Sequence, residues 1–185
     1  MKRFAAGLMA VFIFVAGAFG NQKVSLGVQA GYFYPWGRDF RDIYGGGVQL
    51  GAELSVCFGG RIMVWAGGSY FGKTGRLSFT REDVAVRLIP LHLALGYQFS
   101  PGKSWRPFIG VGTSLNAFQE VAPLETVKQT RLGLWSQAGI LFRLTKCLAF
   151  EAKCVYNSVR MEFPEADVDL SGISGVLCIK FQLRK

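Results

Sequence analysis

The sequence is poor in the residues on which most metal and catalytic sites depend. It has one histidine, His92, and its four cysteines are 90, 7 and 24 positions apart, spacings that match no zinc-binding pattern. Only 18% of the residues are charged, and the basic excess is not clustered as it is in nucleic-acid-binding proteins. These shortages argue against a zinc site and against a nucleic-acid partner, and we expect no cofactor.

The chain also lacks long apolar runs beyond its N-terminus, although half of its 185 residues are hydrophobic and its mean hydropathy is +0.27. A membrane-spanning helix requires a run of about 18 such residues. Within residues 1–20, Lys2 and Arg3 precede an apolar stretch that ends in the small residues Ala16-Gly17-Ala18. This layout predicts a cleaved secretory signal peptide, with an uncleaved anchor helix as the alternative.

Residues 21–185 would then form the mature domain, with 19 Lys and Arg against 12 Asp and Glu. Such a basic excess suits an anionic lipid surface. An exported chain can oxidise its cysteines. However, the alternation described next places Cys154 and Cys178 on opposite faces of neighbouring strands, so we expect mostly free thiols.

What the mature chain has in abundance is strict alternation of apolar and polar residues. In LAFEAKCVYNS (148–158) the apolar and aromatic residues occupy the even positions, while Glu151, Lys153 and Asn157 occupy odd ones. Alternation of this kind is typical of a β-strand with two unlike faces. Eight such stretches occur, many with ten or more residues: 24–34, 48–58, 61–71, 86–99, 106–118, 131–144, 148–158 and 171–183. About 9–11 tilted residues are enough for a strand to cross a bilayer.

The connections between these stretches alternate between short and long. Tight links rich in Gly, Pro or polar residues lie at 58–61, 100–104 and 145–147, and longer polar links lie at 35–46, 72–83, 119–130 and 162–172. Outer-membrane barrels show this asymmetry, with short turns in the periplasm and long loops outside. The sequence therefore predicts an all-β fold: an eight-stranded antiparallel up-and-down transmembrane β-barrel with four long extracellular loops.

In such a barrel the apolar face of each strand meets lipid and the polar face lines the interior. Leu148, Phe150 and Tyr156 would face lipid. The charged residues predicted to form a polar network in the lumen are Glu53, Arg87, Arg143, Glu151, Lys153 and Lys180. Buried charges are costly unless paired, so we expect the two glutamates to pair with some of the four bases, and inward glycines to make room.

His92 lies in the middle of a predicted strand and is expected to point inward. Acyl hydrolysis would require a nucleophile and an orienting group within hydrogen-bond reach of it, and Pro90 and Ala94 are its neighbours on the same face. A lumen histidine is therefore the favoured interpretation over a catalytic one.

The stretch LIPLHLALGYQFSPGKSWRPFIGVG (88–112) resembles the small outer-membrane β-barrel families, of the OmpX and OmpW kind, in which two such strands are joined by a short turn. Leu177, Ile179 and Phe181 resemble the terminal-strand signal of these families, although Leu183-Arg184-Lys185 follow the last aromatic. The resemblance implies location in the bacterial outer membrane, contact with outer-membrane lipid and lipopolysaccharide, and insertion by the barrel-assembly machinery. These families share a fold but not one activity.

Two sets of residues in the long links are candidates for recognition. Trp36, Phe40 and Tyr44 could stack on a ligand in the first link. Lys73, Arg76 and Arg81 make the second link basic and could contact lipopolysaccharide phosphates, but a merely solvated loop explains them equally well.

An eight-stranded barrel encloses a lumen that side chains can fill, so we expect no large open pore. The favoured function is a non-enzymatic structural or surface-interaction role carried by the long loops. The alternatives are transport of small hydrophobic molecules through the barrel wall, a lipid-modifying enzyme, and a soluble ligand-holding periplasmic barrel whose faces would be reversed.

Overall fold

The computed structural model describes residues 22–76, 83–121, 126–162 and 167–183. The predicted signal peptide at 1–20 and Arg81 lie outside these ranges. The described wall strands are β1 Gln22–Pro35, β2 Gly47–Phe58, β3 Ile62–Arg76, β4 Asp83–Gln98, β5 Trp105–Val121, β6 Thr126–Arg143, β7 Leu148–Ser158 and β10 Gly172–Leu183. No helix in the described ranges is long and apolar enough to cross a bilayer.

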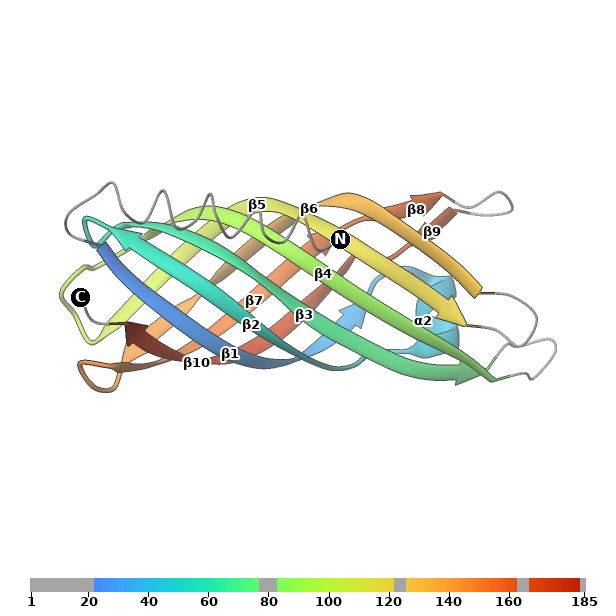
Figure 1. Ribbon diagram of the computed structural model, residues 1–185, viewed down its shortest axis with the longest axis horizontal. Coiled ribbons are helices and arrows are strands. Elements are labelled where there is room, and N and C mark those ends of the chain that lie inside the picture. The colour runs from blue at the N-terminus through green and yellow to red at the C-terminus, as the bar shows by residue number, and fades with distance from the viewer. Residues whose placement is uncertain (1–21, 77–82, 122–125, 163–166, 184–185) are drawn as a thin grey trace.

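The eight wall strands of the described chain form one closed antiparallel barrel in the order β1-β10-β7-β6-β5-β4-β3-β2 (Figure 1). Each strand pairs with its neighbour in the sequence, and β1 closes the ring against β10 from Val24↔Leu183 to Pro35↔Gly172. Closure pairs both edges of each strand around the middle of the wall, as a sheet surrounded by lipid requires. The predicted fold class is therefore confirmed.

The two ends of the barrel differ, and we call them the turn end and the loop end. At the turn end β2 and β3 are joined through Gly59 and Gly60, which adopt positive φ angles of 56° and 74°. The loop end carries helix α2 (Arg38–Tyr44) and a small hairpin of β8 (Arg160–Glu162) and β9 (Asp167–Asp169), seen at the right of Figure 1.

The predicted second and third long loops, 72–83 and 119–130, are wrong in extent. Half of the first segment and two thirds of the second are strand, because β3 to β6 continue past the apolar band as a paired wall, for example Thr74↔Ala85 and Gln119↔Lys128. The outer face of this extension carries polar residues, so apolar and polar residues no longer alternate clearly there. The hydrogen-bonded pairing of the strands nevertheless continues.

The outer face of the barrel is apolar between two aromatic zones. On β4 the outward side chains from Ile89 to Tyr97 are exposed Ile, Leu and Tyr residues. A run of about ten strand residues at the usual tilt rises about 25 Å, the height of the apolar band in outer-membrane barrels. Exposed aromatics flank this band, with Tyr97, Phe99 and Trp105 at the turn end and Tyr32, Tyr34 and Tyr70 at the loop end. The predicted outward orientation of apolar residues is confirmed.

Side chains fill the interior in its middle and at its loop end. Polar residues occupy its middle together with Trp65, Phe108 and Trp135. At the loop end an apolar cluster, here called the loop-end cap, is formed by Phe33, Phe40, Tyr44, Phe71, Val84, Val86, Leu88, Phe118, Val159, Met161 and Leu170. Helix α2 contributes Phe40 and Tyr44 to this cap and strand β8 contributes Met161, so the loops pack onto the inner face of the wall.

Candidate functional site in the barrel lumen

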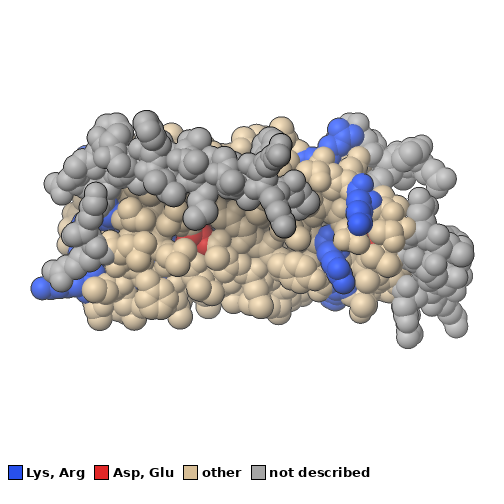
Figure 2. All heavy atoms as spheres, in the orientation of Figure 1, with Lys and Arg blue, Asp and Glu red and all other residues tan. Residues whose placement is uncertain are grey.

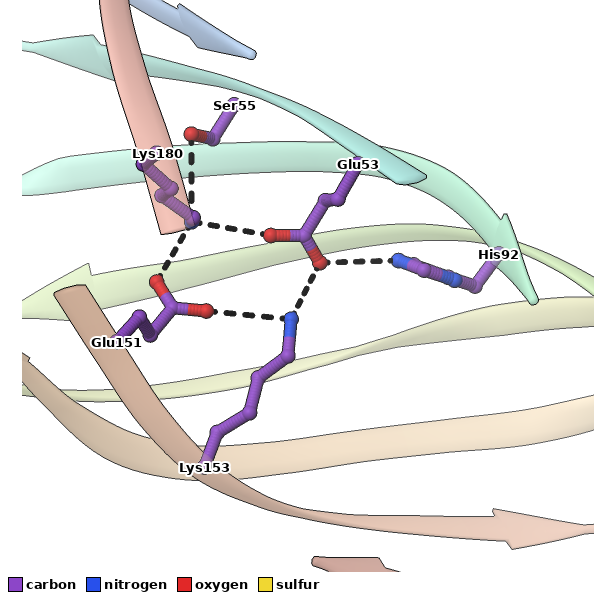
Figure 3. Close-up of polar contacts among 6 residues, drawn as sticks. All are labelled: Glu53, Ser55, His92, Glu151, Lys153 and Lys180. Carbon is purple, nitrogen blue, oxygen red and sulfur yellow. Dashed lines mark hydrogen bonds and ion pairs between the residues drawn. The ribbon is translucent and has the colours of Figure 1, made fainter. Parts of the chain in front are cut away.

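The most unusual feature of the lumen is a group of charged side chains in its middle, the ion-pair cluster (Figure 3). Glu53 projects from β2, Glu151 and Lys153 from β7, and Lys180 from β10. Each of these side chains has at most 2% of its surface exposed. Residues two apart on β7 share one face of the strand, which is why Glu151 and Lys153 both point inward.

The cluster is a closed ring of alternating charges. Lys153 Nζ lies 2.6 Å from Glu53 Oε2 and 3.2 Å from Glu151 Oε1. Lys180 Nζ lies 2.6 Å from Glu151 Oε2 and 3.0 Å from Glu53 Oε1. Each ammonium therefore bridges both carboxylates, and the four formal charges cancel. Buried charges are tolerated only with such pairing, because removal from water costs several kcal/mol per ion.

His92 on β4 contacts the cluster through Glu53. Its Nε2 lies 3.2 Å from Glu53 Oε2, and its ring stacks on Trp135 with centroids 4.1 Å apart. Ser114 faces His92 in the β4–β5 register, but its hydroxyl donates to Asn157 Oδ1 at 2.6 Å. The arrangement thus orients a histidine against a carboxylate and leaves the serine hydroxyl in a separate network.

Glycines in neighbouring strands make room for the cluster, as the sequence predicts. A Cβ at Gly27 would lie 3.1 Å from Lys180 Cγ, and one at Gly139 would lie 2.7 Å from Lys153 Cβ. At Gly67 it would lie 2.9 Å from His92 Cε1 and 2.6 Å from a backbone oxygen. The long side chains on four strands therefore depend on glycines in three of the strands between them.

The structure does not bring all six predicted lumen residues together. Glu53, Glu151, Lys153 and Lys180 form the cluster, whereas the prediction for Arg87 is wrong. Arg87 is exposed on the outer face of β4, because it has the same parity as the lipid-facing Ile89. Arg143 does point inward, but it lines a chamber at the turn end.

The predicted recognition residues of the first loop are also separated by the structure. Phe40 and Tyr44 are 3% and 4% exposed and belong to the loop-end cap, so the prediction that they stack on a ligand is wrong. Trp36 is exposed, and its ring packs on Tyr156 at 5.1 Å. Burial and the nearby Glu120 carboxylate raise the pKa of the Tyr44 phenol above its usual range.

Two of the basic residues of the predicted second loop, Lys73 and Arg76, lie in β3. Lys73 is a residue of β3, and its ammonium donates a hydrogen bond to the backbone oxygen of Gly46, which holds the first loop against the wall. Arg76 ends β3 opposite Asp83 in the register. Lys73 therefore has a structural contact that the prediction of lipopolysaccharide binding did not include.

Two interior residues that sequence reasoning missed are Trp65 and Trp135, which are 0% and 6% exposed in the lumen. Trp65 packs on Phe108 with centroids 5.5 Å apart. Both faces of β3 carry bulky residues, so alternation does not show which way the Trp65 side chain points. Its orientation follows from the pairing with β4, because Trp65 is opposite Ala94, whose side chain points inward.

Comparison with known proteins assigns the chain to a family. Residues 69–181, more than half of the chain, match the family model described as Opacity family porin protein. The chain belongs to the Opacity family. Among curated proteins, none matches it by sequence.

Solved structures of outer-membrane barrels share the fold of this Opacity-family chain. The outer membrane protein OprG from Pseudomonas aeruginosa matches with a TM-score of 0.73 and 15% identity, over 90% of this chain and 98% of that one. Neisserial surface protein A matches with a TM-score of 0.65 and 15% identity, over 90% and 100%. The attachment invasion locus protein Ail of Yersinia pestis, in complex with the heparin analogue sucrose octasulfate, matches with 0.53 and 12%, over 89% and 99%.

Proposed function

We propose that this outer-membrane barrel is non-enzymatic, carries no open pore, and acts at the bacterial surface through its loop end. The observation that carries the proposal is the filling of the lumen by side chains. Glu53, Trp65 and Lys180 are each at most 2% exposed across its middle. The loop-end cap packs next to them, and this filling of the described part of the lumen supports the absence of an open path along the axis.

Conductance across planar bilayers tests the absence of a pore. The refolded chain is expected to give no porin-sized current steps, whereas a general porin in the same membrane gives them. As a matched check, Trp65→Ala combined with Trp135→Ala removes two rings from the lumen and should raise the frequency of small openings. Porin-sized steps from the unmodified chain would overturn the proposal.

The surface role is supported by basic side chains at the loop end. Gln119 on β5 pairs with Arg87 on β4 and with Lys128 on β6. The side chains of Arg87 and Lys128 are exposed on the outer face, just beyond the apolar band. Figure 2 shows that Lys and Arg side chains gather at the ends of the barrel and leave the middle of this face nearly free of them. This height above the band is where lipopolysaccharide phosphates would meet the wall.

Lipopolysaccharide is therefore the proposed partner of the loop end. Charged nitrogen donors form strong hydrogen bonds with phosphate oxygens. The complex of Ail with a sulfated heparin analogue supports the idea that a barrel of this size can bind a polyanion.

Paired variants at the two ends of the outer wall test this partner. Arg87→Gln with Lys128→Gln should weaken lipopolysaccharide binding to the refolded barrel several-fold. Arg61→Gln with Lys103→Gln removes two exposed cations at the turn end and should leave binding unchanged. Equal effects of the two pairs would contradict a loop-end site.

Transport of small hydrophobic molecules is the second candidate, because the interior of the loop end is apolar. A hydrophobic solute entering at the loop end would meet the loop-end cap first and the ion-pair cluster next. The cluster would force it to leave sideways through the wall. Uptake of a lipophilic dye into liposomes that contain the barrel, compared with empty liposomes, would distinguish this function from a purely surface role.

A further inference from the structure

A chamber opens into the lumen at the turn end, below the ion-pair cluster. Its wall is formed by residues of β1 to β7 and β10, and in the described chain these are Lys23, Ser25, Ser55, Cys57, Met63, Gln98, Arg106, Leu141, Arg143, Ala149, Lys180 and Gln182. Four of these side chains are cationic. The outer-membrane assignment and the proposed loop-end role both leave this chamber unexplained.

The charges of the chamber do not balance. None of its lining residues in the described chain is Asp or Glu. Lys180 is neutralised from above by Glu53 and Glu151, with which its ammonium makes ion pairs of 3.0 and 2.6 Å. Lys23, Arg106 and Arg143 remain, and they give the chamber an excess of positive charge.

The two guanidinium groups are the centre of this excess. Arg106 is only 5% exposed, although its neighbours on the turn are open to water. Its Nε donates to the Lys103 backbone oxygen at 3.0 Å, which fixes the side chain and leaves its terminal nitrogens for another acceptor. Arg106 and Arg143 lie close enough for their charges to repel each other. Arg143 is only partly buried, but two like charges that face one enclosed space favour a counter-charge there.

Neutral hydrogen-bond donors surround the same space. Ser55 Oγ lies 3.4 Å from Lys180 Nζ and accepts from it, so its own hydroxyl hydrogen can point into the chamber. Ser25 and Gln182 line the same wall. Guanidinium forks together with hydroxyl and amide donors are the groups that bind phosphate oxygens, because each oxygen can accept more than one hydrogen bond.

We propose that the turn-end chamber is a binding site for one small oxyanion of the phosphate class, held by Arg106 and Arg143. The chamber faces the side of the membrane on which the short turns lie. The same chemistry is offered by free phosphate or a phosphate monoester in solution and by the head group of a phospholipid.

Calorimetric titration of the refolded mature chain in maltoside detergent, which contains no phosphate, tests the site with inorganic phosphate. Ionic strength is held constant with chloride. We expect saturable binding of one phosphate, weakened at least tenfold by Arg143→Gln and largely kept by Arg143→Lys. Arg38→Gln, which removes an exposed cation from α2 at the opposite end of the barrel, should bind as the unmodified chain does. Absence of saturable binding, or equal binding by Arg143→Gln, would overturn the proposal.

Cysteine labelling provides a second readout that requires no variant to fold. Cys57 lines the chamber, whereas Cys147 is exposed in the β6–β7 turn outside it. Saturating phosphate should slow the reaction of Cys57 with an anionic thiosulfonate at least threefold, as measured by mass spectrometry of the labelled peptides. The reaction of Cys147 should not change. Equal slowing at both cysteines, or no slowing at Cys57, would contradict a site in the chamber.

The source of the anion is distinguished by competition. A short-chain phosphatidylglycerol added to the same micelles displaces inorganic phosphate if the site accepts a lipid head group. If phosphate binds without displacement by the lipid, the site is assigned to soluble phosphate. Both results support the chamber as an oxyanion site.

Discussion

The ion-pair cluster and the loop-end cap fill neighbouring parts of one lumen with opposite chemistry. The cluster joins β2, β4, β7 and β10, strands that are not all neighbours in the ring. The cap joins α2 and β8 to the inner faces of β3, β4 and β5. Charge pairs therefore link the barrel wall across its interior, while apolar packing attaches the loops to the wall.

This difference follows from the surroundings of each region, which are lipid around the wall and water around the loops. The apolar side chains of the wall are already in contact with lipid, so turning them inward would add little stability. The middle of the lumen can therefore be polar, provided that every charge is paired. Beyond the apolar band the loops are surrounded by water, where burial of apolar area stabilises them as in a soluble protein. The two regions should therefore respond differently to substitution.

Glu53→Gln should have the largest effect, because Glu53 accepts from Lys153, Lys180 and His92 together. Its loss leaves two buried ammonium groups facing one carboxylate, and breaking such a pair costs about 3–5 kcal/mol. Urea unfolding of the barrel in lipid vesicles measures the loss. Asp42→Asn, at an exposed acid on α2, should change the free energy of unfolding by less than about 0.5 kcal/mol.

Phe40→Ala should loosen the cap while the barrel stays folded. Truncation of a buried Phe costs about 3–5 kcal/mol, but here the loss falls on the docking of α2 against Phe71. Limited proteolysis should cut the first loop faster. On a denaturing gel the unboiled variant should still migrate differently from the boiled one, a gel shift expected of a closed barrel that stays folded in detergent. Trp36→Ala, which removes an exposed ring from the same loop, should not accelerate cleavage. Loss of the gel shift in Phe40→Ala would show that the cap supports the wall as well.

Gly67→Ala tests the space around the cluster. The new methyl group would meet the Ala52 backbone oxygen and the His92 ring, and overpacking of this kind costs about 1–3 kcal/mol. Gly175→Ala is the matched control, because a Cβ at Gly175 meets no atom within 4 Å. Equal stability of the two variants in urea would mean that the lumen yields easily at this level.

Replacement of the whole cluster should have the smallest effect on stability. With Glu53, Glu151, Lys153 and Lys180 all changed to Met or Leu, no unpaired charge remains, and such exchanges are often close to neutral. Urea unfolding should then show a loss well below that of Glu53→Gln alone. A loss as large as that of Glu53→Gln would mean that the charges stabilise the barrel beyond pairing each other.

The sequence predicts the wall better than the ends. Alternation identifies the strands, and it orients β7 correctly because Glu151 and Lys153 contrast sharply with their apolar neighbours. Alternation places Arg87 on the outer face with Ile89. The inward orientation predicted for Arg87 was wrong because it rested on the charge of the residue and not on its position in the strand. Trp65 could not be oriented from alternation, because both faces of β3 are bulky.

The cap lies beyond what strand alternation can reveal. Phe40, Ile43 and Tyr44 have the spacing of one helical face, which could have indicated that α2 buries an apolar side. Their burial, however, depends on the extension of β3 to β6, whose polar outer residues carry little alternation. The contacts between α2 and β3, such as that of Phe40 with Phe71, join residues far apart in the sequence, and no local pattern specifies them.

Native-state hydrogen exchange, followed by mass spectrometry in increasing urea, tests the contrast between the two regions most directly. Amides of α2 and β8 should exchange through local opening with little dependence on urea. Amides of β2 and β7 around Glu53 and Glu151 should exchange only with global unfolding of the barrel. If both regions exchange with the same free energy and the same dependence on urea, the cap and the cluster form one cooperative unit, and the division of roles is contradicted.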